Sequence, residues 1–192
     1  TLINNFADTV LNLTLKDVKI DVSDTGSYWV EGKAALSVQG KGNVEIELDG
    51  NNELKSGTQS AGLEKTSTGT LTLKDDNKDG SLKATGGANG AGIGGSMNNG
   101  TNKITIKGGT VTAKGGDCGA GIGGGNGGIG ENIKITDGTV NATGGWGGAG
   151  IGGGDGGYGG YGNGKNITIT DGTVTATGGI HGAGCLLYTS DA

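Results

Sequence analysis

Apolar residues alternate with polar residues or glycine in many short stretches of this chain. The pattern is clearest in ITI at 104–106, TVT at 110–112 and AGI at 120–122. A period of two is typical of short β-strands that bury one face, and apolar residues do not recur at the 3.6-residue spacing of an amphipathic helix. Because glycine-bearing segments separate the stretches, the pattern predicts short strands joined by tight corners.

The same alternating unit returns along the chain, with its apolar residues in the same places. The phrase GAGIGG begins at Gly90, and GAGIGGG begins at Gly119 and again at Gly148. The unit has a period of about thirty residues, which lies in the range of solenoid repeats. Six copies place one inner apolar residue each at an equivalent position: Leu13, Ile46, Leu73, Ile106, Ile135 and Ile169.

Three short strands per unit, repeated in a fixed register, predict an all-β fold. We expect a right-handed single-stranded parallel β-helix, or β-solenoid, of about six coils. Residues 1–184 would form this domain, with 1–42 as a divergent first coil or cap. Each isoleucine of a GAGI phrase would stack on the isoleucine of the previous coil, while glycine provides corners with positive φ and room for backbones to approach each other.

The segment between each GAGI phrase and the next alternating stretch varies in length and is longest after Ile151. Variable insertions at one corner of a solenoid indicate an edge that bears loops. In repeat proteins such an edge is often the binding face.

Composition narrows the possible functions. The chain has 192 residues, with 48 Gly, no Pro and 4% aromatic residues, so we expect a thin aliphatic core. The net charge of −5 and the scattered lysines provide no basic stripe, which argues against a nucleic-acid partner. No apolar run is long enough for membrane insertion. The two cysteines, Cys118 and Cys185, match no metal-binding spacing, and a disulfide between them is an open alternative.

The combination of ITI(K/T)(G/D)GTVTA with GAGIGGG, over about residues 43–184, resembles the glycine-rich repeats of large surface proteins of anaerobic, gut-type bacteria. It is similar, more loosely, to the calcium-containing parallel β-helix carbohydrate-binding modules of such bacteria. The resemblance implies a secreted or cell-surface, non-catalytic module of a larger chain, with a polysaccharide or surface glycan as its partner. The last residues, CLLYTSDA at 185–192, break the repeat and resemble a translated sequencing adapter, so we expect a non-native tail.

One segment has the residue order of a calcium loop. The sequence DDNKDG at 75–80 places side-chain oxygens at Asp75, Asn77 and Asp79, with Gly80 available for a sharp turn. Oxygen ligands of this kind suit a structural Ca²⁺ ion. The match is incomplete, because the twelfth position of an EF-hand loop needs a glutamate and this chain has Gly86 there. The alternative is an exposed acidic turn.

Aromatic residues in the loops are candidates for sugar contacts. Trp146 lies at a position that neighbouring units fill with Asp117 and Ile180, so we expect it to be outside, and Tyr158 and Tyr161 lie in the longest loop. Flat aromatic rings stack on the C–H faces of sugars. The alternative is that these residues merely cover the coil. Tyr28 and Trp29, near the divergent start, are expected in a cap.

Other function classes have less support from the sequence. Asp137 and Asp171 occupy equivalent corners, as a paired-carboxylate hydrolase would need, but each Asp-Gly also suits an ordinary turn. The chain has no arginine for lyase chemistry. We therefore expect no enzyme activity. A partial T-x-T array, which includes Thr110 and Thr112, leaves ice binding open, but Asn141 interrupts it. The expected function is carbohydrate binding or adhesion, with a purely structural stalk as the alternative.

Overall fold

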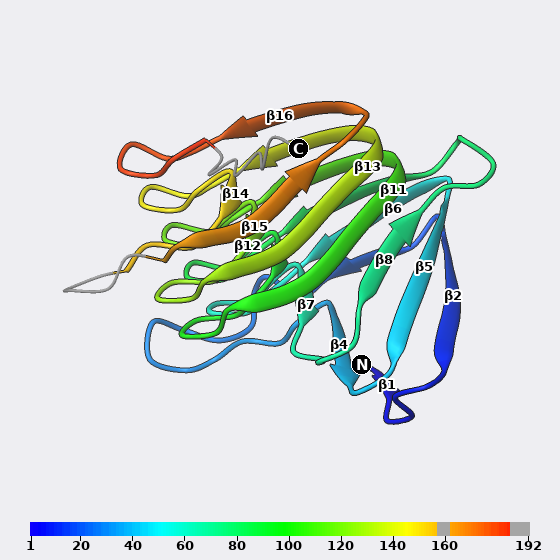
Figure 1. The fold of residues 1–192 in the computed structure, drawn as a ribbon. Coiled ribbons are helices and arrows are strands. Elements are labelled where there is room, and N and C mark those ends of the chain that lie inside the picture. The colour runs from blue at the N-terminus through cyan, green and yellow to red at the C-terminus, as the bar shows by residue number, and fades with distance from the viewer. Residues whose placement is uncertain (157–161, 185–192) are drawn as a thin grey trace.

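The computed structural model describes residues 1–156 and 162–184, which form a parallel β-solenoid of three strand-bearing faces (Figure 1). The chain makes about five turns, so each face has six strands. Face A consists of β1 (Leu2–Asn4), β4 (Leu36–Gly40), β7 (Leu63–Lys65), β10 (Ile93–Gly94), β12 (Ile122–Gly123) and β14 (Ile151–Gly152). The predicted β-solenoid is confirmed.

Faces B and C together form one larger sheet, which is folded at the corner between them. Two long strands, β11 (Thr101–Lys114) and β13 (Gly130–Thr143), run through this corner and belong to both faces. Face B also contains β2 (Val10–Lys16), β5 (Asn43–Asp49), β8 (Leu71–Lys74) and β15 (Gly164–Ile169). Face C also contains β3 (Lys19–Asp21), β6 (Asn51–Lys55), β9 (Ser81–Thr85) and β16 (Thr173–Thr177).

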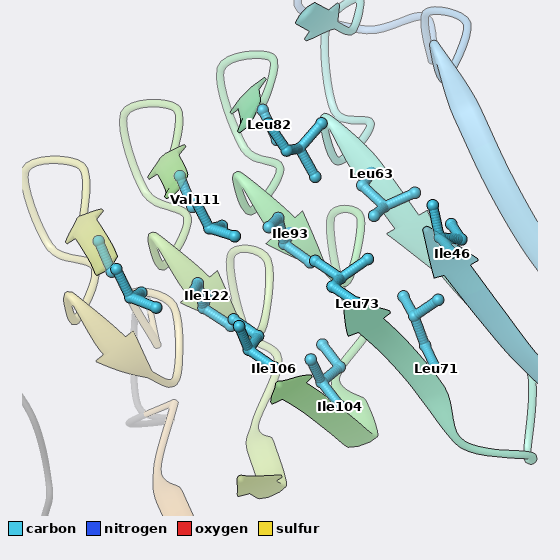
Figure 2. Packing of buried hydrophobic residues seen from close by; sticks show 14 of the residues in the cluster. Ile46, Leu63, Leu71, Leu73, Leu82, Ile93, Ile104, Ile106, Val111 and Ile122 are labelled. Carbon is cyan, nitrogen blue, oxygen red and sulfur yellow. The ribbon is translucent and has the colours of Figure 1, made fainter. Parts of the chain in front are cut away.

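The core is an aliphatic column that runs the length of the solenoid. The six inner residues predicted to be equivalent are partners in the observed parallel register, and the four in the middle coils have no exposed surface. Figure 2 shows the same stacking on face A, where Ile122 lies beside Ile93 and Ile93 beside Leu63. The alanines of the GAGI phrases are buried too, although they lie outside this central cluster.

The corner between faces B and C explains the Gly-Gly and Asp-Gly pairs. The register of β11 and β13 shifts there, as expected for a bulged bend. Gly109, Gly138 and Gly172 have φ values of 83°, 96° and 92° at this corner. Side-chain-bearing residues rarely adopt this left-handed conformation, so glycine permits the turn.

The glycine-rich phrases form a stack of loops that leads from face C back to face A. We call this the loop stack; it consists of residues 22–35, 56–62, 86–92, 115–121, 144–150 and 178–184. Neighbouring loops lie backbone on backbone: a Cβ atom added to Gly116 would lie 1.8 Å from the carbonyl oxygen of Gly87, and one added to Gly145 would lie 1.7 Å from that of Gly116. No side chain fits at these positions, so glycine recurs there in successive coils.

Candidate functional site

An exposed ring pair lies at the tips of the last two loops of the loop stack. Trp146 is 55% exposed. Its indole ring meets the His181 imidazole edge to face, with ring centroids 4.5 Å apart and an interplanar angle of 83°. The His181 amide also donates to the Trp146 carbonyl oxygen at 3.1 Å. Trp146 is therefore outside, as predicted, and its ring is supported by a neighbouring loop rather than by the core.

A cavity of about 290 Å³ adjoins this ring pair at His181, while Trp146 itself does not line it. His181, Ala149, Asp155 and Asn163 line it, together with glycine backbone from three loops. The Asp155 amide donates to the Cys118 carbonyl oxygen at 2.7 Å, which ties the segment after β14 to the loop stack. The cavity thus combines an imidazole, a carboxylate and an amide beside an exposed indole. Polar groups next to a flat ring are the elements that hold sugar hydroxyls and sugar C–H faces.

The two predicted tyrosine contacts, Tyr158 and Tyr161, lie outside the described residues. The segments that flank them are described, and Gly156 and Gly162 line the same cavity. Of the three aromatic residues predicted to contact sugars, only Trp146 lies among the described residues. The sequence analysis did not predict that His181, Asp155 and Asn163 lie together, because pairing between loops of neighbouring coils is not visible in one repeat.

The first loop of the loop stack ends in a second aromatic tip. Tyr28 and Trp29 are 73% and 87% exposed, and their rings meet edge to face with centroids 4.6 Å apart. We expected these residues in a cap near the divergent start. The structure shows that both rings are turned to solvent and that their loop continues the loop stack. The Gln59 side chain donates to the Tyr28 carbonyl oxygen at 3.0 Å, which fixes the tip to the next loop.

The candidate calcium segment forms a longer corner between β8 and β9. Asp75 accepts a hydrogen bond from the Gly80 amide at 3.1 Å, while its Oδ1 is buried without a hydrogen-bond partner. Asn77 and Asp79 are exposed. Among the described residues, no three His, Cys, Asp or Glu side chains converge closely enough to hold a metal ion. A calcium ion here would depend on the Asn77 amide and on backbone carbonyl oxygens in addition to the two carboxylates.

The stacked aspartates of the B–C corner act as turn residues. Asp137 accepts a hydrogen bond from the Gly138 amide at 2.7 Å, and Asp171 accepts one from the Gly172 amide at 2.7 Å. Both aspartates are exposed. Their side chains thus stabilise the corners in which they lie, as the turn explanation of Asp-Gly predicts.

Sequence reasoning missed a second cavity, which lies at the corner between faces A and B. It has a volume of about 380 Å³, and its lining includes Lys65, Thr101, Lys103 and Glu131. Lys65 is only 2% exposed. The alternation in LEK at 63–65 was an available signal, because it places the lysine on the same side of β7 as the core residue Leu63.

Four stretches of the chain match the sequence model of the Beta helix repeat family, at residues 78–97, 104–126, 133–155 and 167–184. Each stretch contains a GAGI phrase or the alternating strands that flank it. No curated protein and no solved structure is significantly similar to the chain. The described residues contain no helix long and apolar enough to span a membrane. These matches cover less than half of the chain, and they agree with the β-solenoid fold that the structure shows.

Proposed function

We propose that this protein is a non-catalytic carbohydrate-binding or adhesive module, secreted or displayed on a bacterial surface as part of a larger chain. The observation behind the proposal is the exposed Trp146–His181 ring pair beside a cavity lined by Asp155 and Asn163. The indole would stack on a sugar ring, and the polar groups would bind its hydroxyls.

The rigidity of the loop stack supports this role. The loops are joined by backbone hydrogen bonds between coils, for example from Gly145 to the Gly119 carbonyl oxygen at 2.9 Å. A binding tip held in this way loses little conformational entropy when a ligand arrives. Repetition of coils about 4.8 Å apart would also let several weak contacts with one polysaccharide add up.

A glycan array tests the proposal, with binding measured for the unchanged protein, Trp146→Ala and Trp29→Ala. We expect the unchanged protein to bind a subset of neutral or acidic oligosaccharides. Trp146→Ala should lose about 5-fold to 150-fold in affinity, since one stacked ring contributes on the order of 1–3 kcal/mol in comparable base–aromatic stacking. Trp29→Ala is the matched control, because it removes an exposed indole from the other end of the loop stack. The Trp29→Ala variant should bind short oligosaccharides with the same affinity as the unchanged protein.

Absence of binding to any glycan, with and without calcium, would contradict the proposal and favour a structural stalk. The uniform parallel register over six strands per face is the observation that supports a stalk. A structural Ca²⁺ ion in the Asp75 corner would be compatible with either role. Its support is the buried Asp75 Oδ1 that has no hydrogen-bond partner in the described part of the chain.

A further inference from the structure

The second cavity exists because the corners of two neighbouring coils differ in length. Glu64 pairs with Gly94 on face A, and Leu71 pairs with Ile104 on face B. The corner from β7 to β8 therefore advances seven residues, from 64 to 71. The equivalent corner from β10 to β11 advances ten, from 94 to 104. The longer corner projects beyond the shorter one, and a cavity of about 380 Å³ lies at this step. Small-molecule pockets in proteins begin at about this volume.

A buried cation lies in the wall of this cavity. The Lys65 ammonium donates to the Ser67 carbonyl oxygen at 2.8 Å, and no ion pair with Lys65 occurs among the described residues. An ammonium group has three donors, and a buried charge is costly without a counter-charge. Burial, and secondarily the nearby Lys103 charge, lower the pKa of Lys65 to about 8. The Lys65 ammonium group thus has a neutral acceptor, the Ser67 carbonyl oxygen, and no negatively charged partner within the described ranges.

A second buried group in the wall is also without a partner. Thr101 is 4% exposed, and its Oγ1 makes no hydrogen bond within the described ranges. It comes from the coil after that of Lys65, and Lys103 follows it on β11. Buried hydroxyls are normally hydrogen-bonded, so an unpaired hydroxyl at a cavity wall indicates a place for a ligand atom or a water molecule.

We propose that this cavity binds the carboxylate of a small polyhydroxylated acid, held by the ammonium groups of Lys65 and Lys103 and by the Thr101 hydroxyl. A single negative charge fits best, because Glu131 lies in the same wall and would repel a dianion such as phosphate. Glu131 is itself paired with Lys165 at 3.4 Å. The half-exposed Ile129 and the Asn99 amide provide apolar and polar surface for the rest of the ligand.

The cavity at Lys65 is separate from the proposed glycan site. It lies where face A leads to face B, whereas Trp146 lies where face C leads to face A. A carboxylate of this kind occurs in a free sugar acid and in a uronic-acid unit of a polymer. Glucuronate and an alginate oligomer therefore serve as the two probes, and glucose serves as the neutral control.

Calorimetric titration of the whole chain tests the inference with three variants. We expect Lys103→Met to weaken glucuronate binding about tenfold, which is the effect of losing one charge-assisted hydrogen bond. Thr101→Val should weaken binding as well, yet leave the melting temperature unchanged or higher, because it removes a buried hydroxyl that has no partner. Lys114→Met, which removes an exposed lysine of face C, should bind as the unchanged protein does.

The two probes distinguish the sources of the carboxylate. Glucuronate binding that depends on Lys103 assigns the site to a free acid, and alginate binding alone with the same dependence assigns it to a polymer. Equal binding of glucose and glucuronate, unchanged affinity in both Lys103→Met and Thr101→Val, or no binding of either acid would overturn the inference. Glucuronate binding that is lost in Trp146→Ala but kept in Lys103→Met would assign the acid to the site beside Trp146 and overturn this inference, so a failure here is separate from a failure of the glycan array.

Discussion

Single residues in this protein are constrained mainly by how closely neighbouring backbones approach. The isoleucine column was predictable from the sequence, because a period of two assigns each side chain to one face. The close contacts of the glycines were predictable in kind, since glycine permits such an approach. Their positions were not, because they depend on which loop lies above which. The environments of Lys65 and His181 were missed for the same reason, since both are set by residues of other coils.

Glycines in one coil should differ sharply in their tolerance of alanine. In Gly116→Ala the added Cβ would lie 1.8 Å from the Gly87 carbonyl oxygen, so the loops must separate, at a cost of about 3 kcal/mol or more. Gly108→Ala is the matched control, because its Cβ would lie no closer than 3.3 Å to Asp75. We expect it to change stability by less than about 1 kcal/mol. Chemical denaturation measures both, and equal losses would contradict backbone stacking as the cause.

Lys65 should make stability depend on pH in the alkaline range. Its pKa is about 8 in the folded protein and 10.5 when unfolded, so between these values the unfolded chain binds more protons. The free energy of unfolding should therefore rise with pH across this window, on the order of 1–3 kcal/mol in total. Lys65→Met should lack this rise. Urea denaturation of both proteins between pH 7 and 10.5 checks the difference, and parallel curves would show that Lys65 is not responsible.

At the scale of elements, the strands could be predicted from the sequence, whereas the candidate sites at the corners could not. The strands and the Asp-Gly turns follow from short-range patterns, and they are observed where the sequence places them. The candidate site required knowledge of loop lengths in neighbouring coils. The cavity beside Trp146 and the cavity at Lys65 both lie where the loops of adjacent coils meet. The Asp75 corner is also longer than its neighbours, and its role is the one most open to a simple test.

Calcium should stabilise the protein if the Asp75 corner binds it. At a concentration well above the dissociation constant, the gain is about 2–3 kcal/mol, which corresponds to a rise of several degrees in melting temperature. Asp79→Ala should remove this rise, whereas Asp171→Ala, in a shorter corner, should retain it. Melting curves in calcium and in a chelator provide the measurement. Identical curves for the unchanged protein would identify the corner as a plain acidic turn.

At the scale of the whole molecule, each coil contacts only its neighbours, so stability should depend on position along the stack. Ile135 and Ile169 are register partners in one column, but Ile135 has no exposed surface and Ile169 is only partly buried. Ile135→Ala should cost about 2–5 kcal/mol, and Ile169→Ala clearly less. Thermal denaturation of both variants provides the comparison. A larger loss for Ile169→Ala would mean that the last coil determines stability.

The bases and the tips of the loops differ in how well they tolerate substitution. At a base such as Gly116, any added atom collides with the preceding loop. One residue further along, Asp117, Trp146 and Ile180 occupy matching places and all extend into solvent. Mutations at these tips can therefore accumulate with little penalty to folding. A lineage carrying this scaffold would diversify its exposed loop tips one at a time while the inherited framework stays intact.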